Sequence, residues 1–146
     1  TPLAGACNMI WNGVTWEREY ANVEGTVLAS LARTITTTGT ITNRRFRGVV
    51  LYLDITAVPV APGAGGLQVG LYIADPISGN LILVNTLPTK VITVSTTAYL
   101  FYPGSAAATG AITQYTDVAL PRSLTAKVVV NDSQSYTYSL GYALLN

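Results

Sequence analysis

Three arginines stand close together, Arg44, Arg45 and Arg47, and they form the only basic cluster of the sequence. Such a cluster could contact phosphate, nucleic acid or an acidic patch on another protein. The formal net charge is only +1, however, whereas nucleic-acid-binding domains usually carry a clear basic excess. We therefore expect these arginines to make polar contacts or salt bridges at a strand edge, without direct binding of nucleic acid.

Residues that could carry catalysis are sparse. The sequence has no histidine and one cysteine, Cys7, so that thiol lacks the commonest general base and no disulfide can form within the chain. Asp54 falls in the middle of an expected strand, while Asp75, Asp117 and Asp132 fall in expected turns or loops, and no two carboxylates are predicted to converge. We expect Asp54 to pair with an arginine or a hydroxyl of a neighbouring strand. The sequence predicts no enzyme, no cofactor and no metal site.

Both tryptophans, Trp11 and Trp16, lie in the first 22 residues. Gly5, Gly13 and the lack of helical periodicity favour an extended N-terminal arm over residues 1–22. Exposed tryptophans on an arm are typical of anchors that dock into another protein. An alternative stays open, in which the two rings cap the domain's own core.

The nine tyrosines allow three interpretations. Tyr52 and Tyr72 are expected on the outer faces of two strands, and Tyr136, Tyr138 and Tyr142 share one face of another. Such rows could stack sugars, pack against neighbouring subunits, or lie inside the protein's own core with their hydroxyls at the rim.

The clearest strand is expected over 46–58. Its core face carries Val49, Leu51, Leu53 and Ile55, and its outer face carries Val50, Tyr52, Asp54 and Thr56. Residues 67–74 alternate in the same way, and pairing of these two strands across the Pro/Gly-rich segment 59–66 is plausible. Further strands are expected over 26–33, 34–42, 81–87, 90–97, 98–102, 112–120, 124–130 and 136–144, with a bulge or tight turn at Gly39 and a turn at 75–80.

The last two strands, 124–130 and 136–144, are expected to pair with each other. We read Asn131-Asp132-Ser133 as the turn between them and not as a glycosylation site. Short strands separated by turns predict an all-β fold, an antiparallel β-sandwich or jelly-roll-like single domain over 23–146, preceded by the arm.

Only 10% of the residues are charged, against about 25% in a typical soluble domain. A surface with so little charge suits permanent contact with other chains, and we expect a homo-oligomer. No apolar run reaches the length of about 18 residues that a membrane span needs, so no membrane partner is expected.

The stretches RRFRGVVLYLDITAV and LQVGLYIADPISGN, and ALPRSLTAKVVV followed by a Tyr/Ser-rich strand, resemble small virion proteins of tailed bacteriophages. The resemblance covers residues 44–146. It implies a β-sandwich that decorates or reinforces a capsid, with trimers as the favoured assembly, made in the host cytoplasm and located on the capsid exterior.

The sequence thus predicts a non-enzymatic structural protein that stabilises a phage head by binding the major capsid protein lattice and neighbouring copies of itself. The expected contact residues are Trp11, Trp16, Arg44, Arg45, Arg47, Tyr52 and Tyr72. The alternative is a carbohydrate-binding or adhesion module, or a component of the phage tail or neck.

Overall fold

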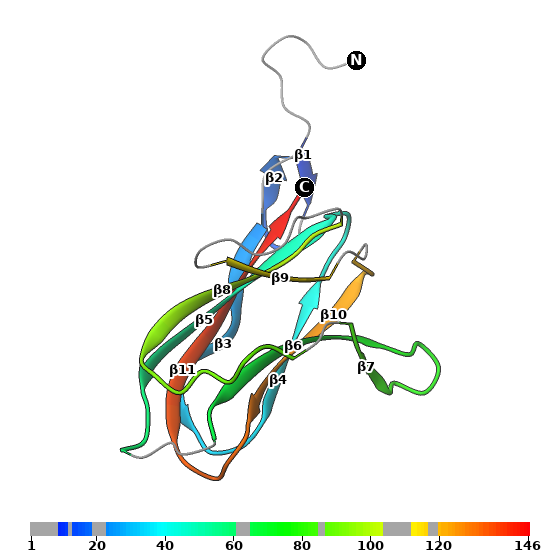
Figure 1. Ribbon diagram of the computed structural model, residues 1–146. Coiled ribbons are helices and arrows are strands. Elements are labelled where there is room, and N and C mark those ends of the chain that lie inside the picture. The colour runs from blue at the N-terminus through cyan, green and yellow to red at the C-terminus, as the bar shows by residue number, and fades with distance from the viewer. Residues whose placement is uncertain are drawn as a thin grey trace.

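The computed structural model describes residues 9–11, 13–18, 23–60, 65–84, 87–103, 112–116 and 120–146. Every regular element in these ranges is a strand, and the strands form a small hairpin and two larger sheets that pack face to face (Figure 1). The predicted all-β sandwich is confirmed. The described residues include no helix that is long and apolar enough to cross a membrane.

One layer is a five-stranded sheet with the order β3-β11-β5-β8-β9. The first four strands pair antiparallel, and β9 pairs parallel to β8. The bounds are β3 (Val23–Arg33), β11 (Tyr136–Leu145), β5 (Gly48–Ala57), β8 (Ser95–Phe101) and β9 (Ile112–Thr116). Strand β11 therefore lies inside the sheet, between two strands that come much earlier in the sequence.

The second layer is an antiparallel four-stranded sheet with the order β4-β10-β6-β7. Its strands are β4 (Thr37–Thr42), β10 (Ser123–Val130), β6 (Leu67–Ala74) and β7 (Leu81–Leu83). The hairpin of β1 (Met9–Trp11) and β2 (Trp16–Arg18) is a separate sheet, and it lies at the end of the sandwich where the chain also terminates (Figure 1).

The core lies between the two layers and follows the predicted alternation. The inward side chains of β5 are almost completely buried, namely Val49, Leu51, Leu53 and Ile55. Leu53 pairs with Leu140 of β11, which is equally buried, so the two central strands share one apolar face. Val50 departs from the prediction, because it is buried although it belongs to the outer face of β5.

Two predicted strand pairings are wrong. Strand β5 does not pair with β6, and β10 does not pair with β11, because each of these two connections crosses from one sheet to the other. The crossovers meet, since the backbone N and the side-chain Nδ2 of Asn131 both donate to the Gly66 carbonyl, at 3.1 and 3.0 Å. The segment after Val130 is therefore a turn, as expected, but it connects two layers and does not close a hairpin.

Several strand boundaries also differ from the prediction. In place of the expected strands 90–97 and 98–102 there is one strand, β8 (Ser95–Phe101), and Val91 instead forms an isolated bridge with Leu67 at the start of β6. Strand β7 ends at Leu83, β9 ends at Thr116, β4 begins at Thr37 and β3 begins at Val23. Within the expected segments 81–87 and 112–120, residues 85–86 and 117–119 lie outside the described residues.

The turn at 75–80 has the predicted chemistry. Asp75 accepts hydrogen bonds from the Ser78 hydroxyl at 2.6 Å and from the Ile77 backbone at 3.0 Å, and Gly79 has φ of +74°. Gly39 is explained differently. It lies in regular pairing with Ala126, and a Cβ there would clash with Val27 of β3, so glycine permits the close approach of the two edge strands.

Tyr136 and Tyr138 belong to the protein's own core, since neither is exposed. Burial raises the pKa of both phenols above the ordinary value of 10.0. The neutral forms are favoured in the folded state, so the unfolded chain loses these protons first as the pH rises. The contribution of these two phenols to the free energy of unfolding is therefore fully present below pH 10, and it is lost as the pH rises toward the raised pKa values.

We predict that the urea midpoint of unfolding decreases as the pH rises from about 9 to about 11, because Tyr136 and Tyr138 lose their protons in the unfolded chain before they do so in the folded protein. The double variant Tyr136→Phe/Tyr138→Phe should lose less of its midpoint over this range than the parent does. Urea unfolding followed by circular dichroism at each pH provides the measurement. An equal loss in both proteins would contradict the role of these phenols.

Candidate functional site

The two tryptophans form a cross-strand pair on the β1–β2 hairpin. Trp11 lies opposite Trp16, with ring centroids 5.7 Å apart and planes inclined by 55°. Both rings remain open to solvent, at 47% exposure for Trp11 and 64% for Trp16. Met9 and Val14 are also exposed, so the described part of the hairpin presents a compact apolar surface.

The expected arm over 1–22 is described only in part. Residues 1–8, 12 and 19–22 lie outside the described residues, Cys7 among them. The described part forms paired strands, which the sequence did not indicate because each strand has only three residues. Gly13, between the strands, has φ of +102°, a conformation that favours glycine.

Arg44 connects this hairpin to the sandwich. Its Nη1 donates a hydrogen bond to the Trp11 carbonyl at 3.1 Å. Its Nη2 also lies 3.7 Å from the point where a Cβ of Gly13 would stand. A two-stranded hairpin of this size is marginal alone, so contact with the body of the protein helps to order it. The structure therefore brings together two features that the sequence analysis had treated separately.

Asn43 positions the arginine segment, and the sequence analysis missed it. Its side chain is polar and yet only 3% exposed, so its hydrogen bonds must be made within the protein. Its Nδ2 donates to the Phe46 carbonyl at 2.8 Å and to the Pro121 carbonyl at 3.3 Å, and its Oδ1 accepts from the Phe46 backbone at 2.8 Å. The only available signal was an asparagine at the end of a β-prone run, a common turn residue.

The three arginines diverge and do not form one anion site. Arg44 reaches the hairpin, while the guanidinium carbon of Arg45 lies 5.6 Å from the ring centre of Phe46. The guanidinium carbon of Arg47 lies 5.7 Å from the ring centre of Tyr102. Each arginine thus has a different aromatic or backbone neighbour. This favours a role for the three side chains in holding neighbouring segments in place.

The two predicted outer tyrosines lie on opposite sides of the sandwich. Tyr52 belongs to the five-stranded sheet and Tyr72 to the four-stranded sheet, so they cannot form one surface. Tyr72 is half-buried over Gly70, where a Cβ would lie 2.6 Å from the ring. The Lys127 ammonium stands 4.3 Å from the centre of the same ring, so Tyr72 is already engaged within the protein.

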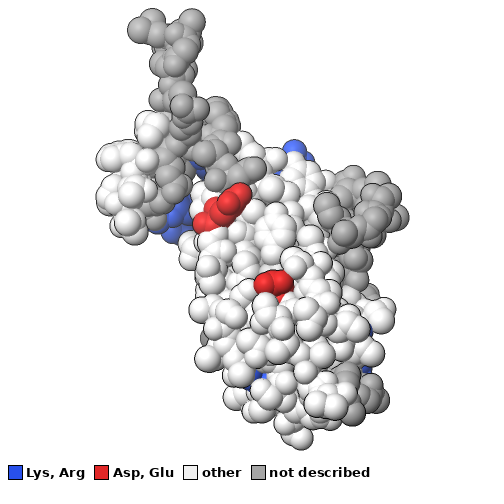
Figure 2. All heavy atoms as spheres, turned by 90° about the vertical axis from the view of Figure 1, so that its left-hand side faces the viewer, with Lys and Arg blue, Asp and Glu red and all other residues white. Residues whose placement is uncertain are grey.

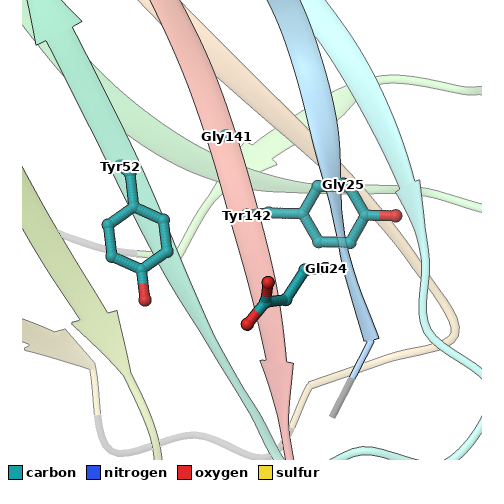
Figure 3. Close-up of a pocket in the computed structure, with 5 residues that line it drawn as sticks. All are labelled: Glu24, Gly25, Tyr52, Gly141 and Tyr142. Carbon is teal, nitrogen blue, oxygen red and sulfur yellow. The ribbon is translucent and has the colours of Figure 1, made fainter.

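Tyr52, in contrast, lies beside an open hollow on the outer face of the five-stranded sheet. The hollow is lined by Glu24, Gly25, Tyr52, Gly141 and Tyr142 (Figure 3). The corresponding side of the molecule carries few charges: small acidic spots lie on its middle part, and basic atoms are visible beside the hairpin and near the edges (Figure 2). The sequence could not reveal this site, because its residues come from three strands whose pairing was not predicted.

Asp54 makes the hydrogen bond that was expected of it. The Thr96 hydroxyl, on the neighbouring strand β8, donates to Asp54 Oδ1 at 2.7 Å. In the described ranges, no three residues of the types His, Cys, Asp and Glu gather closely enough to hold a metal ion.

The fold defines the protein as an all-β sandwich with an apolar hairpin at one end. No protein family, no curated protein and no solved structure matches the chain.

We predict that Asn43→Ala lowers the free energy of unfolding by about 2–4 kcal/mol, because it leaves the buried Phe46 N–H and the carbonyls of Phe46 and Pro121 without their side-chain partner. The control Asn80→Ala, at an exposed turn, should change it by less than about 0.5 kcal/mol. Urea unfolding at neutral pH measures both. Equal effects of the two substitutions would contradict the proposed importance of Asn43.

We predict that Arg44→Ala loosens the hairpin while the sandwich stays folded, because the bond to the Trp11 carbonyl is lost. Steady-state anisotropy of tryptophan fluorescence should fall, since both tryptophans of the chain lie on this hairpin. Arg122→Ala, whose side chain is also exposed, is the matched control and should leave the anisotropy unchanged. An unchanged anisotropy in Arg44→Ala would show that other contacts hold the hairpin.

Proposed function

We propose that the protein is a non-enzymatic structural protein that attaches to a larger protein assembly through its β1–β2 hairpin. The observation that carries the proposal is the pair of tryptophans, whose rings pack on each other and yet stay about half exposed. Tryptophan and arginine are the residue types most enriched among those that dominate protein–protein binding. The hairpin has two tryptophans, and Arg44 lies beside it.

The apolar surface is large enough to matter energetically. A buried tryptophan removes about 200 Å² from water, so covering the exposed halves of both rings would bury about 200 Å² more. At about 25 cal/mol per Å², this corresponds to about 5 kcal/mol before association costs. Repeated over many copies on one assembly, such contacts would add substantial stability.

The assembly that we propose is the exterior of a phage capsid, with the major capsid protein as partner. This part rests on the resemblance of residues 44–146 to virion proteins of tailed phages. The low charge of the surface, 10% of residues, also favours permanent contact with neighbouring copies, for which we propose trimers. Of the expected contact residues, Trp11 and Trp16 would touch the capsid, and Arg44 would act by positioning them.

A place in the phage tail or neck would use the same hairpin on a different protein surface. The two possibilities are separated by the assembly that the purified protein binds. Undecorated capsids that gain thermal stability support the capsid, whereas binding to tails or necks alone excludes it.

We predict that Trp11→Ala and Trp16→Ala each weaken attachment to undecorated capsids at least tenfold, because each removes an anchor from the centre of the contact. Cosedimentation and the thermal rupture temperature of the capsids measure this effect. Ile77→Ala is the control, because Ile77 is also an apolar, exposed side chain (95%) but lies at the distant β6–β7 turn.

Deletion of residues 1–22 should abolish attachment and leave the sandwich folded. Attachment that survives this deletion would overturn the role of the hairpin. A strictly monomeric state, both free and on the particle, would contradict the proposed contacts between copies.

A further inference from the structure

We propose that the hollow formed by β3, β11 and β5 binds a neutral pyranose sugar, with one face of the sugar ring on Tyr52 and its hydroxyls directed at Glu24. This binding site lies on the outer face of a sheet, away from the hairpin, and is independent of the proposed attachment to a capsid. The lining residues come from strands that are distant in sequence but adjacent in the sheet (Figure 3).

The strand register leaves room for a ligand between the aromatic and the acidic side chain. Tyr52 pairs with Gly141 on β11, and Glu24 pairs with Ala143 two residues further along the same strand. Gly141 and Ala143 have no side chain large enough to fill the space above β11. The Tyr52 ring stands on the β5 side of β11, and the Glu24 side chain extends from β3 so that its carboxylate lies over β11 and toward the tyrosine (Figure 3).

The charge of the hollow selects against anions. Among its five lining residues there is one carboxylate, Glu24, and no lysine or arginine. A phosphate or a carboxylated sugar would be repelled at this site. A neutral sugar suits it, because sugar hydroxyls donate strong hydrogen bonds to an ionised carboxylate. The apolar C–H face of a pyranose also packs well on an aromatic ring.

The site is also rigid enough to bind without reorganisation. Tyr52 is 42% exposed, but its neighbours along β5, Leu51 and Leu53, are anchored in the core. On the other side, Tyr142 packs against Gly25, where a Cβ would lie 2.7 Å from the ring. A binding residue on a fixed strand loses little conformational freedom when a ligand arrives.

The outer face continues with further polar groups in the next row of the sheet. Ser139 pairs with Asp54, and Asp54 accepts the hydrogen bond from Thr96. These groups offer hydroxyl and carboxylate oxygens to a sugar unit beyond the first. On the opposite side of the sandwich, Tyr72 lies under the Lys127 ammonium and is not open to a sugar in the same way.

The test is a titration of the full-length, ¹⁵N-labelled protein with the methyl pyranosides of glucose, galactose, mannose and N-acetylglucosamine, each to tens of millimolar. At least one should shift the amide resonances of Tyr52, Gly141 and Glu24 in a saturable manner. Tyr52→Ala should abolish these shifts, and Glu24→Gln should weaken binding about tenfold through loss of the charged acceptor. Tyr72→Ala is the matched control and should bind as the parent does.

Two results would overturn the proposal: no saturable shift with any of the four sugars, or binding that survives Tyr52→Ala. Failure of this site is distinguishable from failure of the proposed attachment. Tyr52→Ala should still attach to capsids, and Trp11→Ala should still bind the sugar.

Discussion

The side-chain amide of Asn43 lies in the interior and makes hydrogen bonds in two directions, to Phe46 in its own loop and to Pro121 from another. A buried amide is tolerated only when it is paired, so these bonds fix one conformation of the loop. From that loop Arg44 reaches the hairpin, and the Arg47 backbone donates to the Leu145 carbonyl. One asparagine therefore orders the loop that contacts both the first and the last described strands at this end of the sandwich.

The protein has two surfaces of different chemical character, the hairpin end and the outer face of the five-stranded sheet. The hairpin end is apolar and aromatic, and it suits a contact that excludes water from both partners. The outer face of the five-stranded sheet carries the carboxylates of Glu24 and Asp54, and it has an open hollow beside Tyr52 and Glu24. In the proposed attachment the hairpin would be covered, and the outer face of the five-stranded sheet would stay free to meet another molecule.

The alternation of apolar and polar residues was enough to predict which side chains of a strand face the core. It could not predict which strands lie next to each other in a sheet. The inward residues of β5 and the turn at Asp75 follow from local periodicity and turn chemistry, and both were predicted correctly. Pairing of β10 with β11 was predicted wrongly, because alternation gives the face of a strand but not its neighbour. The hollow depends on the pairing of β11 with β3 and β5, which was not predicted, so its residues could not be assembled from the sequence. Asn43 was missed for a similar reason, since its importance arises from a carbonyl 78 residues away.

The position of β11 has a consequence for how the protein is made. Tyr136–Leu145 is synthesised after all the other described strands, yet it pairs with both β3 and β5. Until those residues leave the ribosome, the two earlier strands have exposed backbone groups facing the gap that β11 will fill, and the core stays open on that side. The five-stranded sheet therefore cannot close before β11 is available, and contacts between residues so far apart in the chain are slow to form. During that interval the nascent chain depends on its solubility, which its few charges do little to provide.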